Sequence, residues 1–286
     1  MCCLCLLHTL SGCAIRSYAV DQAANALAGQ DLAAEDDLVL VRESSAFYLK
    51  MSESLLRESP SNLKLAQSVA AGFTQYAYAF VAFDAEKTES VNAKAAFVLR
   101  ERAARLYGRA HRHAMSGLEL SSPGFRLSLS QPMQALPQHP SAQQVALAYW
   151  AAASWGGLIS LSKDQPDVVA DLPQAIRLAQ WAWLAQPSYG QGALASLLGT
   201  FEAARPNGSV AQATQYFEQA MRDGAGEQAG PYVAKAESIA LVAQDRVMFE
   251  QLLHQALEVA TRHRNLQNEV MRERAVWLLD MTDDLF

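Results

Sequence analysis

The sequence predicts an all-α protein, and three observations favour that class. Apolar residues recur every three or four positions along most of the chain, which is the spacing of one face of an α-helix. Alternating runs of β-branched residues, which indicate strands, are missing from the sequence. Capping residues and prolines fall at the ends of the periodic segments, as they do at helix boundaries. We expect these helices to pack into one compact helical domain.

The N-terminal part is expected to form three helices. The first covers about 15–28 and ends at Gly29, because glycine is common just after a helix C-terminus. The second covers about 36–59, where Pro60 ends the pattern. The third begins at Asn62, which is a suitable N-cap for the apolar periodic run that follows.

The rest of the chain continues the pattern around one irregular segment. The residues from Pro123 to Pro140 include four prolines, and we expect a loop there. Ser209 and Asp245 each precede a periodic run and are expected to cap it. The remaining helices are expected at about 91–120, 141–161, 172–185, 191–204, 209–222, 232–242, 246–263 and 267–281.

Some of these helices carry the signature of a helical repeat. The pattern Ala-x3-aromatic-x2-Ala, typical of the second helix of a tetratricopeptide repeat, occurs at 213–220 and 103–110. Residues 175–182 fit the same template with alanine in the aromatic place. Small residues allow neighbouring helices to approach closely, and the aromatic ring fills the gap between pairs. We therefore expect a degenerate tetratricopeptide-like array of helical pairs; the alternative is an alanine-rich bundle that matches the pattern by chance.

The N-terminus resembles the signal of a bacterial lipoprotein. Residues 10–13 read Leu-Ser-Gly-Cys, and the leucine-rich run before them is too short to span a bilayer. The expectation is a signal peptide at residues 1–12 and a mature single domain at residues 13–286, lipid-anchored through Cys13. No Lys or Arg precedes Cys13, so we expect the basic start of the signal to be encoded upstream. The alternative is a leucine-rich helix that ends in Ser-Gly-Cys.

Composition narrows the possible functions. All four cysteines lie in the first thirteen residues, so we expect no disulfide framework, zinc cluster or cysteine nucleophile in the folded body. The net charge is −6 and the basic residues are scattered, which argues against nucleic-acid binding. No apolar run after the N-terminus is long enough for a transmembrane helix, and no phosphate loop or cofactor motif is present.

A catalytic site is not expected. The pattern Ser-x-x-Lys occurs at Ser160 and Lys163, but the companion motifs of serine hydrolases of that type are missing. His111 and His113 lie two positions apart on an expected helix, so they point about 200° apart and cannot share a metal ion. We predict no enzymatic activity and no metal site, with a Ser160 hydrolase as the disfavoured alternative.

The remaining candidates are aromatic. Phe73, Tyr76 and Phe80 lie on one expected helix, and Trp150 and Trp155 lie on another. Aromatic rings on a helix usually form core, and the functional alternative is an apolar cavity or channel lined by the rings. We predict that these five residues line a shared channel for a hydrophobic small molecule.

These segments also carry a resemblance to a known family. Several blocks of the sequence resemble, in order, the T-subunit lipoproteins of TRAP (tripartite ATP-independent periplasmic) transporters of the TatT type. These blocks are 73–81 and 84–86, 105–110 and 117–119, 149–156 and 159–163, 169–173, 229–233 and 236–238, and 274–279 and 283–286. Together with the lipoprotein signal, they extend the resemblance over nearly the whole chain from Cys13.

The resemblance implies a specific biology. Members are all-helical, tetratricopeptide-like periplasmic lipoproteins without enzymatic activity, which associate with the soluble substrate-binding P subunit of the transporter. It also implies a homotrimer with an internal, largely apolar channel. Ala14 after Cys13 is not the aspartate of inner-membrane retention, which favours the periplasmic leaflet of the outer membrane. The alternative is a generic tetratricopeptide-like envelope scaffold, unrelated to transport.

Overall fold

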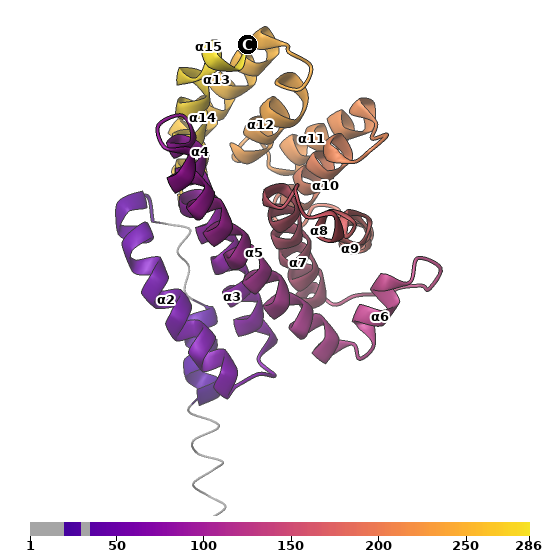
Figure 1. Ribbon diagram of the computed structural model, residues 1–286. Helices are drawn as coiled ribbons and strands as arrows, with labels where there is room; N and C mark the ends of the chain where they lie inside the picture. The colour runs from indigo at the N-terminus through magenta and orange to yellow at the C-terminus, as the bar shows by residue number, and fades with distance from the viewer. Residues whose placement is uncertain (1–19, 30–34) are drawn as a thin grey trace, which may run out of the picture.

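The computed structural model describes residues 20–29 and 35–286, and these residues form an all-helical structure (Figure 1). In the described residues no position is assigned to a strand, which confirms the predicted fold class. The first expected helix is present at residues 20–28. The lipoprotein signal and Cys13 lie outside the described residues.

The first half of the chain is built from long helices with polar N-caps. Asp37 accepts from the backbone amides of Val39 and Leu40, and Asn62 and Asn92 cap later helices in the same way. The elements are α2 (Leu38–Glu58), α3 (Leu63–Tyr76), η1 (Ala77–Ala82), α4 (Phe83–Glu89), α5 (Ala93–Ser121) and α6 (Phe125–Ser130). The element η1 is a π-helix, so the expected third helix is one continuous rod with a wide turn inside it.

The second half continues with shorter helices. Ser209 and Asp245 cap α11 and α13 as predicted. The elements are α7 (Ala142–Leu161), α8 (Pro166–Val169), α9 (Leu172–Ala185), α10 (Ala193–Ala204), α11 (Val210–Asp223), α12 (Gly230–Lys235), η2 (Ala236–Ala240), α13 (Arg246–Arg262), α14 (Leu266–Asp280) and α15 (Thr282–Leu285). A second π-helix, η2, follows α12 directly.

The proline-rich segment differs from the expected loop. It contains α6 and is then fixed to α9 by side chains. The Arg177 guanidinium donates to the carbonyls of Ser128, Leu129 and Gln131, and the Trp181 indole donates to a further carbonyl in the segment at 2.8 Å. Prolines prevent a continuous helix here, but these donors satisfy the free carbonyls and order the chain.

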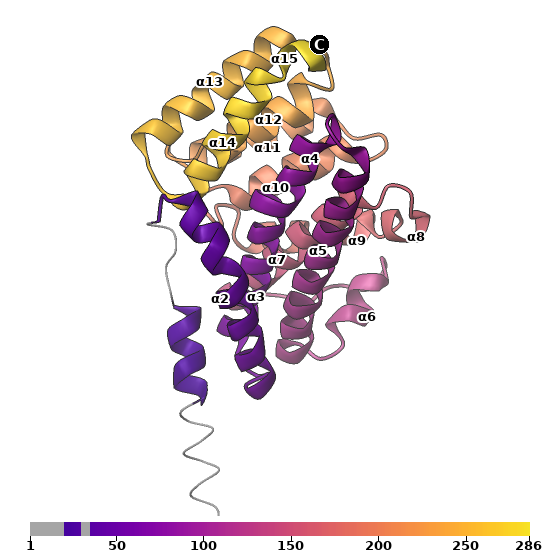
Figure 2. The same cartoon turned by 60° about the vertical axis from the view of Figure 1, so that its left-hand side comes forward.

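Two hydrophobic cores lie along the array. The larger one is formed by α2, α3, α5, α6, α7, α9 and α10, and the smaller one by α12, η2, α13 and α14. Alanines on facing helices are fully buried in both cores, so the helices approach closely (Figures 1 and 2). The second view shows α13 and α14 at one end of the array and the N-terminal helices beneath them.

The packing reproduces the small-residue contacts that the repeat pattern requires. Phe217 of α11 is fully buried, and a Cβ placed on Gly199 of α10 would lie 3.0 Å from its ring. Tyr107 of α5 faces Gly157 of α7 in the same way, and a Cβ placed on that glycine would lie 2.6 Å from the ring. In both pairs the glycine makes room for the aromatic residue of the Ala-x3-aromatic-x2-Ala pattern, which agrees with the tetratricopeptide-like description.

This contact gives a first prediction. Replacing Gly157 by alanine places a methyl group inside the van der Waals distance of the Tyr107 ring, so we expect a loss of about 1–3 kcal/mol in unfolding free energy. Gly108→Ala is the matched control, since its new Cβ would meet no atom closer than 3.6 Å on a helix. We expect that control to be neutral or stabilising by about 0.5–1 kcal/mol. Urea titration of both variants measures the difference; equal midpoints would contradict the packing.

Candidate functional site: an arginine cluster at the junction of the array

Arg274 of α14 connects helices that are far apart in the sequence. Its guanidinium lies 2.9 Å from a carboxylate oxygen of Glu86 in α4 and 2.6 Å from one of Glu237 in η2. Glu237 accepts three hydrogen bonds from it and Glu86 accepts two. The arginine is 8% exposed, so this is a mostly buried charge that two carboxylates neutralise.

Aromatic rings surround this charge. The Arg274 guanidinium lies 5.5 Å from the ring centroid of Tyr78 and 5.4 Å from that of Phe83, within the range of cation–π attraction. Phe83 also meets Trp277 of α14 edge to face at 5.4 Å. We call Arg274, Glu86, Glu237, Tyr78 and Phe83 the Arg274 cluster.

The electrostatics of the cluster follow from burial and charge pairing. Burial alone would lower the pKa of Arg274, but Tyr78, Glu237 and Glu86 together raise it well above its usual value. Partial burial and the neighbouring charge of Glu237 raise the pKa of Glu86 above its usual value, although Arg274 opposes that shift. Burial likewise raises the pKa of Tyr78 to about 12. The arginine and the tyrosine therefore keep their protons at neutral pH.

The first group of predicted channel residues is divided between two environments. Phe73 is buried in the larger core, with the Arg109 guanidinium 5.0 Å from its ring centroid. Tyr76 and Phe80 meet edge to face with centroids 5.6 Å apart. Phe80 belongs to a separate small cluster with Val41 of α2. The structure therefore brings Tyr76 and Phe80 together, and Tyr76 also packs against the larger core that contains Phe73.

The second group lies on α7. Trp155 is buried, and its ring centroid lies 4.4 Å from that of His111; burial lowers the pKa of His111 to about 4. Trp150 is partly exposed and packs against Tyr149 at 4.8 Å. Both tryptophans share the larger core with Phe73. A channel lined by all five predicted residues stays a prediction.

Ser160 and Lys163 do not form a pair in the described part of the chain. The Ser160 hydroxyl donates to the carbonyl of Gly157 at 2.8 Å, within its own helix, and Lys163 is exposed in the turn that follows. Among the described residues, no group of three or more His, Cys, Asp or Glu side chains could hold a metal ion.

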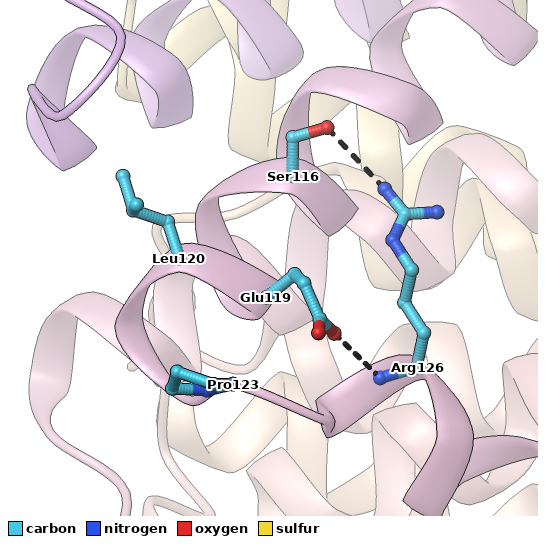
Figure 3. A pocket seen from close by; sticks show the side chains of 5 residues that line it. All are labelled: Ser116, Glu119, Leu120, Pro123 and Arg126. Atoms are coloured by element: carbon cyan, nitrogen blue, oxygen red, sulfur yellow. Dashed lines mark hydrogen bonds between the residues drawn. The ribbon is translucent and has the colours of Figure 1, made fainter.

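An open surface depression lies where α5 meets α6 (Figure 3). Glu119 accepts from the backbone amides of Gly124 and Arg126, and these hydrogen bonds lower the pKa of its carboxyl. The Arg126 guanidinium donates to the Ser116 hydroxyl at 3.3 Å. The polar groups of the depression are thus paired with one another, and their evident role is to hold the start of α6.

Sequence reasoning did not single out Arg274, Glu86 or Glu237 as a site. A signal was nevertheless present, because each lies in a block that carries the family resemblance: 84–86, 236–238 and 274–279. Each charge stands beside apolar residues in its block, and only the fold shows that the three blocks meet.

The paired helices, with buried aromatic and ionic contacts between distant segments, define an all-helical, repeat-like scaffold. Residues 34–286 match the family described as TRAP transporter T-component, and the chain belongs to that family. It is also 28% identical over 265 residues to an uncharacterized protein of Treponema pallidum (strain Nichols), covering 88% of this chain and 81% of that protein.

The family assignment sets the broad role of the chain. The chain is an accessory component of TRAP transporters. This is a transport role, and the family is not known to be enzymatic. In the ranges 20–29 and 35–286, none of the helices combines the length and the apolar character that crossing a membrane requires.

Proposed function

We propose that this chain is the lipid-anchored periplasmic subunit that binds the substrate-binding P subunit of a TRAP transporter. The observation that carries the proposal is the family match, which spans the described body from α2 to the C-terminus. The Leu-Ser-Gly-Cys motif supports anchoring through Cys13, and Ala14 favours the periplasmic leaflet of the outer membrane. The chain acts without enzymatic activity and without nucleic acid.

The proposal includes a homotrimer and an apolar channel. Leu40, Phe47 and Met51 recur on one face of α2 and are exposed, which is the kind of surface that a subunit interface covers. The aromatic residues Tyr76 and Trp150 keep part of their surface accessible and support a route for a hydrophobic small molecule.

Capture from a periplasmic extract tests the partner. The full chain, tagged at its C-terminus, is used as bait in an extract of its own organism, and recovered proteins are identified by mass spectrometry. We expect specific recovery of a TRAP-type substrate-binding protein. Recovery of envelope-assembly proteins alone would instead favour a generic envelope scaffold, and the family likeness would then be one of fold.

The lipid anchor has its own test. We expect cells fed an alkyne-labelled fatty acid to label the wild-type chain and to leave Cys13→Ser unlabelled. Cys5→Ser serves as the control, since that cysteine lies before the expected cleavage site, and its label should be unchanged. Equal labelling of wild type and Cys13→Ser would exclude this anchor.

A further inference from the structure

The C-terminal helices meet the N-terminal helices along a narrow junction. Figures 1 and 2 show α14 near α4, although Glu86 and Arg274, which join the two helices, are 188 positions apart in the chain. The backbones of α4 and α14 hardly approach each other, so side chains make the junction. We call this junction the seam.

The seam contains the Arg274 cluster and apolar side chains from both of its sides. Beside the cluster lie the Phe83–Trp277 contact and a small group in which Val41 and Phe80 pack against Leu266. The Arg264–Asp36 ion pair at 2.9 Å crosses the junction at the surface, where such pairs contribute at most about 1 kcal/mol. The larger core contains no residue of α14 and the smaller core contains none of α4, so neither core extends across the seam.

Both π-helices in the described part of the chain belong to the seam. Tyr78 lies in η1 and Glu237 lies in η2, and both contact Arg274. A π-helix holds one extra residue per turn, and its loss rotates the adjoining helix by about 100°. Each partner of Arg274 therefore lies in a π-helix or in the helix that follows one, and such departures from α-helical geometry are frequent at functional sites.

The two carboxylates of the cluster are not equivalent. The Glu86 side chain is 41% exposed, whereas that of Glu237 is 27% exposed and makes the shorter ion pair with Arg274. Water can therefore replace Arg274 at Glu86 without leaving a buried unpaired charge, while Glu237 stays with the arginine. The groups that face Glu86 are Arg274 and Glu237.

We propose that Arg274 is a latch: the helical array opens at the seam when Glu86 in α4 separates from Arg274, which remains bound to Glu237. Opening moves α4 and η1 away from α14 and η2 and uncovers the rings of Phe80, Phe83 and Trp277. The larger core keeps its structure.

Electron–electron distance measurement between two spin labels tests the latch. The labels are placed at Val91→Cys and Val247→Cys, two exposed positions on opposite sides of the seam, in the full chain with the cysteines at 2, 3, 5 and 13 replaced by serine. We compare Glu86→Gln and Arg274→Met with the unaltered seam. Glu258→Gln is the matched control, because its ion pair with Arg262 lies within α13.

Both seam variants are expected to gain a second, longer distance, and the control is not. In Glu86→Gln, the backbone amides of residues 77–82 and 236–240 should exchange hydrogen about fivefold faster, because the variant loses a half-exposed ion pair. The exchange rates of amides in α7 should not change. Glu86→Gln decides the outcome if Arg274→Met fails to fold. A single unchanged distance and unchanged exchange in folded Glu86→Gln would overturn the latch.

Discussion

Replacing Glu53 by glutamine is expected to lower the unfolding free energy by about 3–5 kcal/mol, the cost of removing one partner from a buried ion pair. The Glu53 side chain is 5% exposed in α2 and receives both a bidentate bond from Arg109 and bonds from Lys50 and His113. Glutamine has nearly the same shape but leaves Arg109 and Lys50 without their shared counter-ion.

The pH dependence should identify the same carboxylate. Burial alone would raise the pKa of Glu53, but the hydrogen bonds from Arg109, Lys50 and His113 outweigh it and lower the pKa to about 2. A lowered folded-state pKa stabilises the protein above the ordinary value of 4.5, and this stability is lost as the pH falls from 4.5 toward 2. Glu53→Gln should lack this part of the acid sensitivity.

Urea titrations between pH 3 and pH 7 measure both effects. Glu43→Gln is the control on the same helix, because Glu43 is exposed and its loss should change stability by less than about 0.5 kcal/mol. If Glu53→Gln matched this control at pH 7, the ion network between α2 and α5 would not stabilise the fold.

Replacing Phe217 by alanine is expected to cost about 3–5 kcal/mol, the range for deleting a fully buried aromatic side chain. Its ring fills the space over Gly199, and it shares a small core with Ala213 and Ile239. Because Ile239 lies in η2, the cavity should also loosen the attachment of the C-terminal helices.

Thermal and urea unfolding of Phe217→Ala measures this cost. Val210→Ala lies on the same helix at a 63% exposed position and is expected to change stability by less than about 0.5 kcal/mol. Near-equal unfolding free energies of the two variants would mean that Phe217, the aromatic residue of the repeat pattern, does not stabilise the packing of these helices.

Local patterns predicted most of the fold correctly. Helices such as α11 and α13 follow from an apolar period and a Ser or Asp cap, which are local properties of the sequence. The π-helices were not predicted, because one inserted residue changes the apolar period too little to detect in a single sequence. The helix α6 was also missed, since the order of its segment depends on Arg177, which is distant in the sequence.

Contacts between distant residues likewise limited the prediction of the candidate functional site. Phe73, Tyr76 and Trp155 were singled out by residue type, and the structure gives them ring or core contacts. The Arg274 cluster depends on a contact between residues 188 positions apart, and helix periodicity carries no information on such a contact. The family resemblance marked the correct blocks without showing that they meet.

Association with the substrate-binding subunit is the central feature of the proposed role, and sedimentation velocity tests it directly. The full-length chain in detergent is mixed with the purified TRAP binding protein of its own organism. We predict that the binding protein moves into a faster boundary together with this chain, and that excess chain leaves no free binding protein. Two independent boundaries, unchanged at all mixing ratios, would contradict the proposed role.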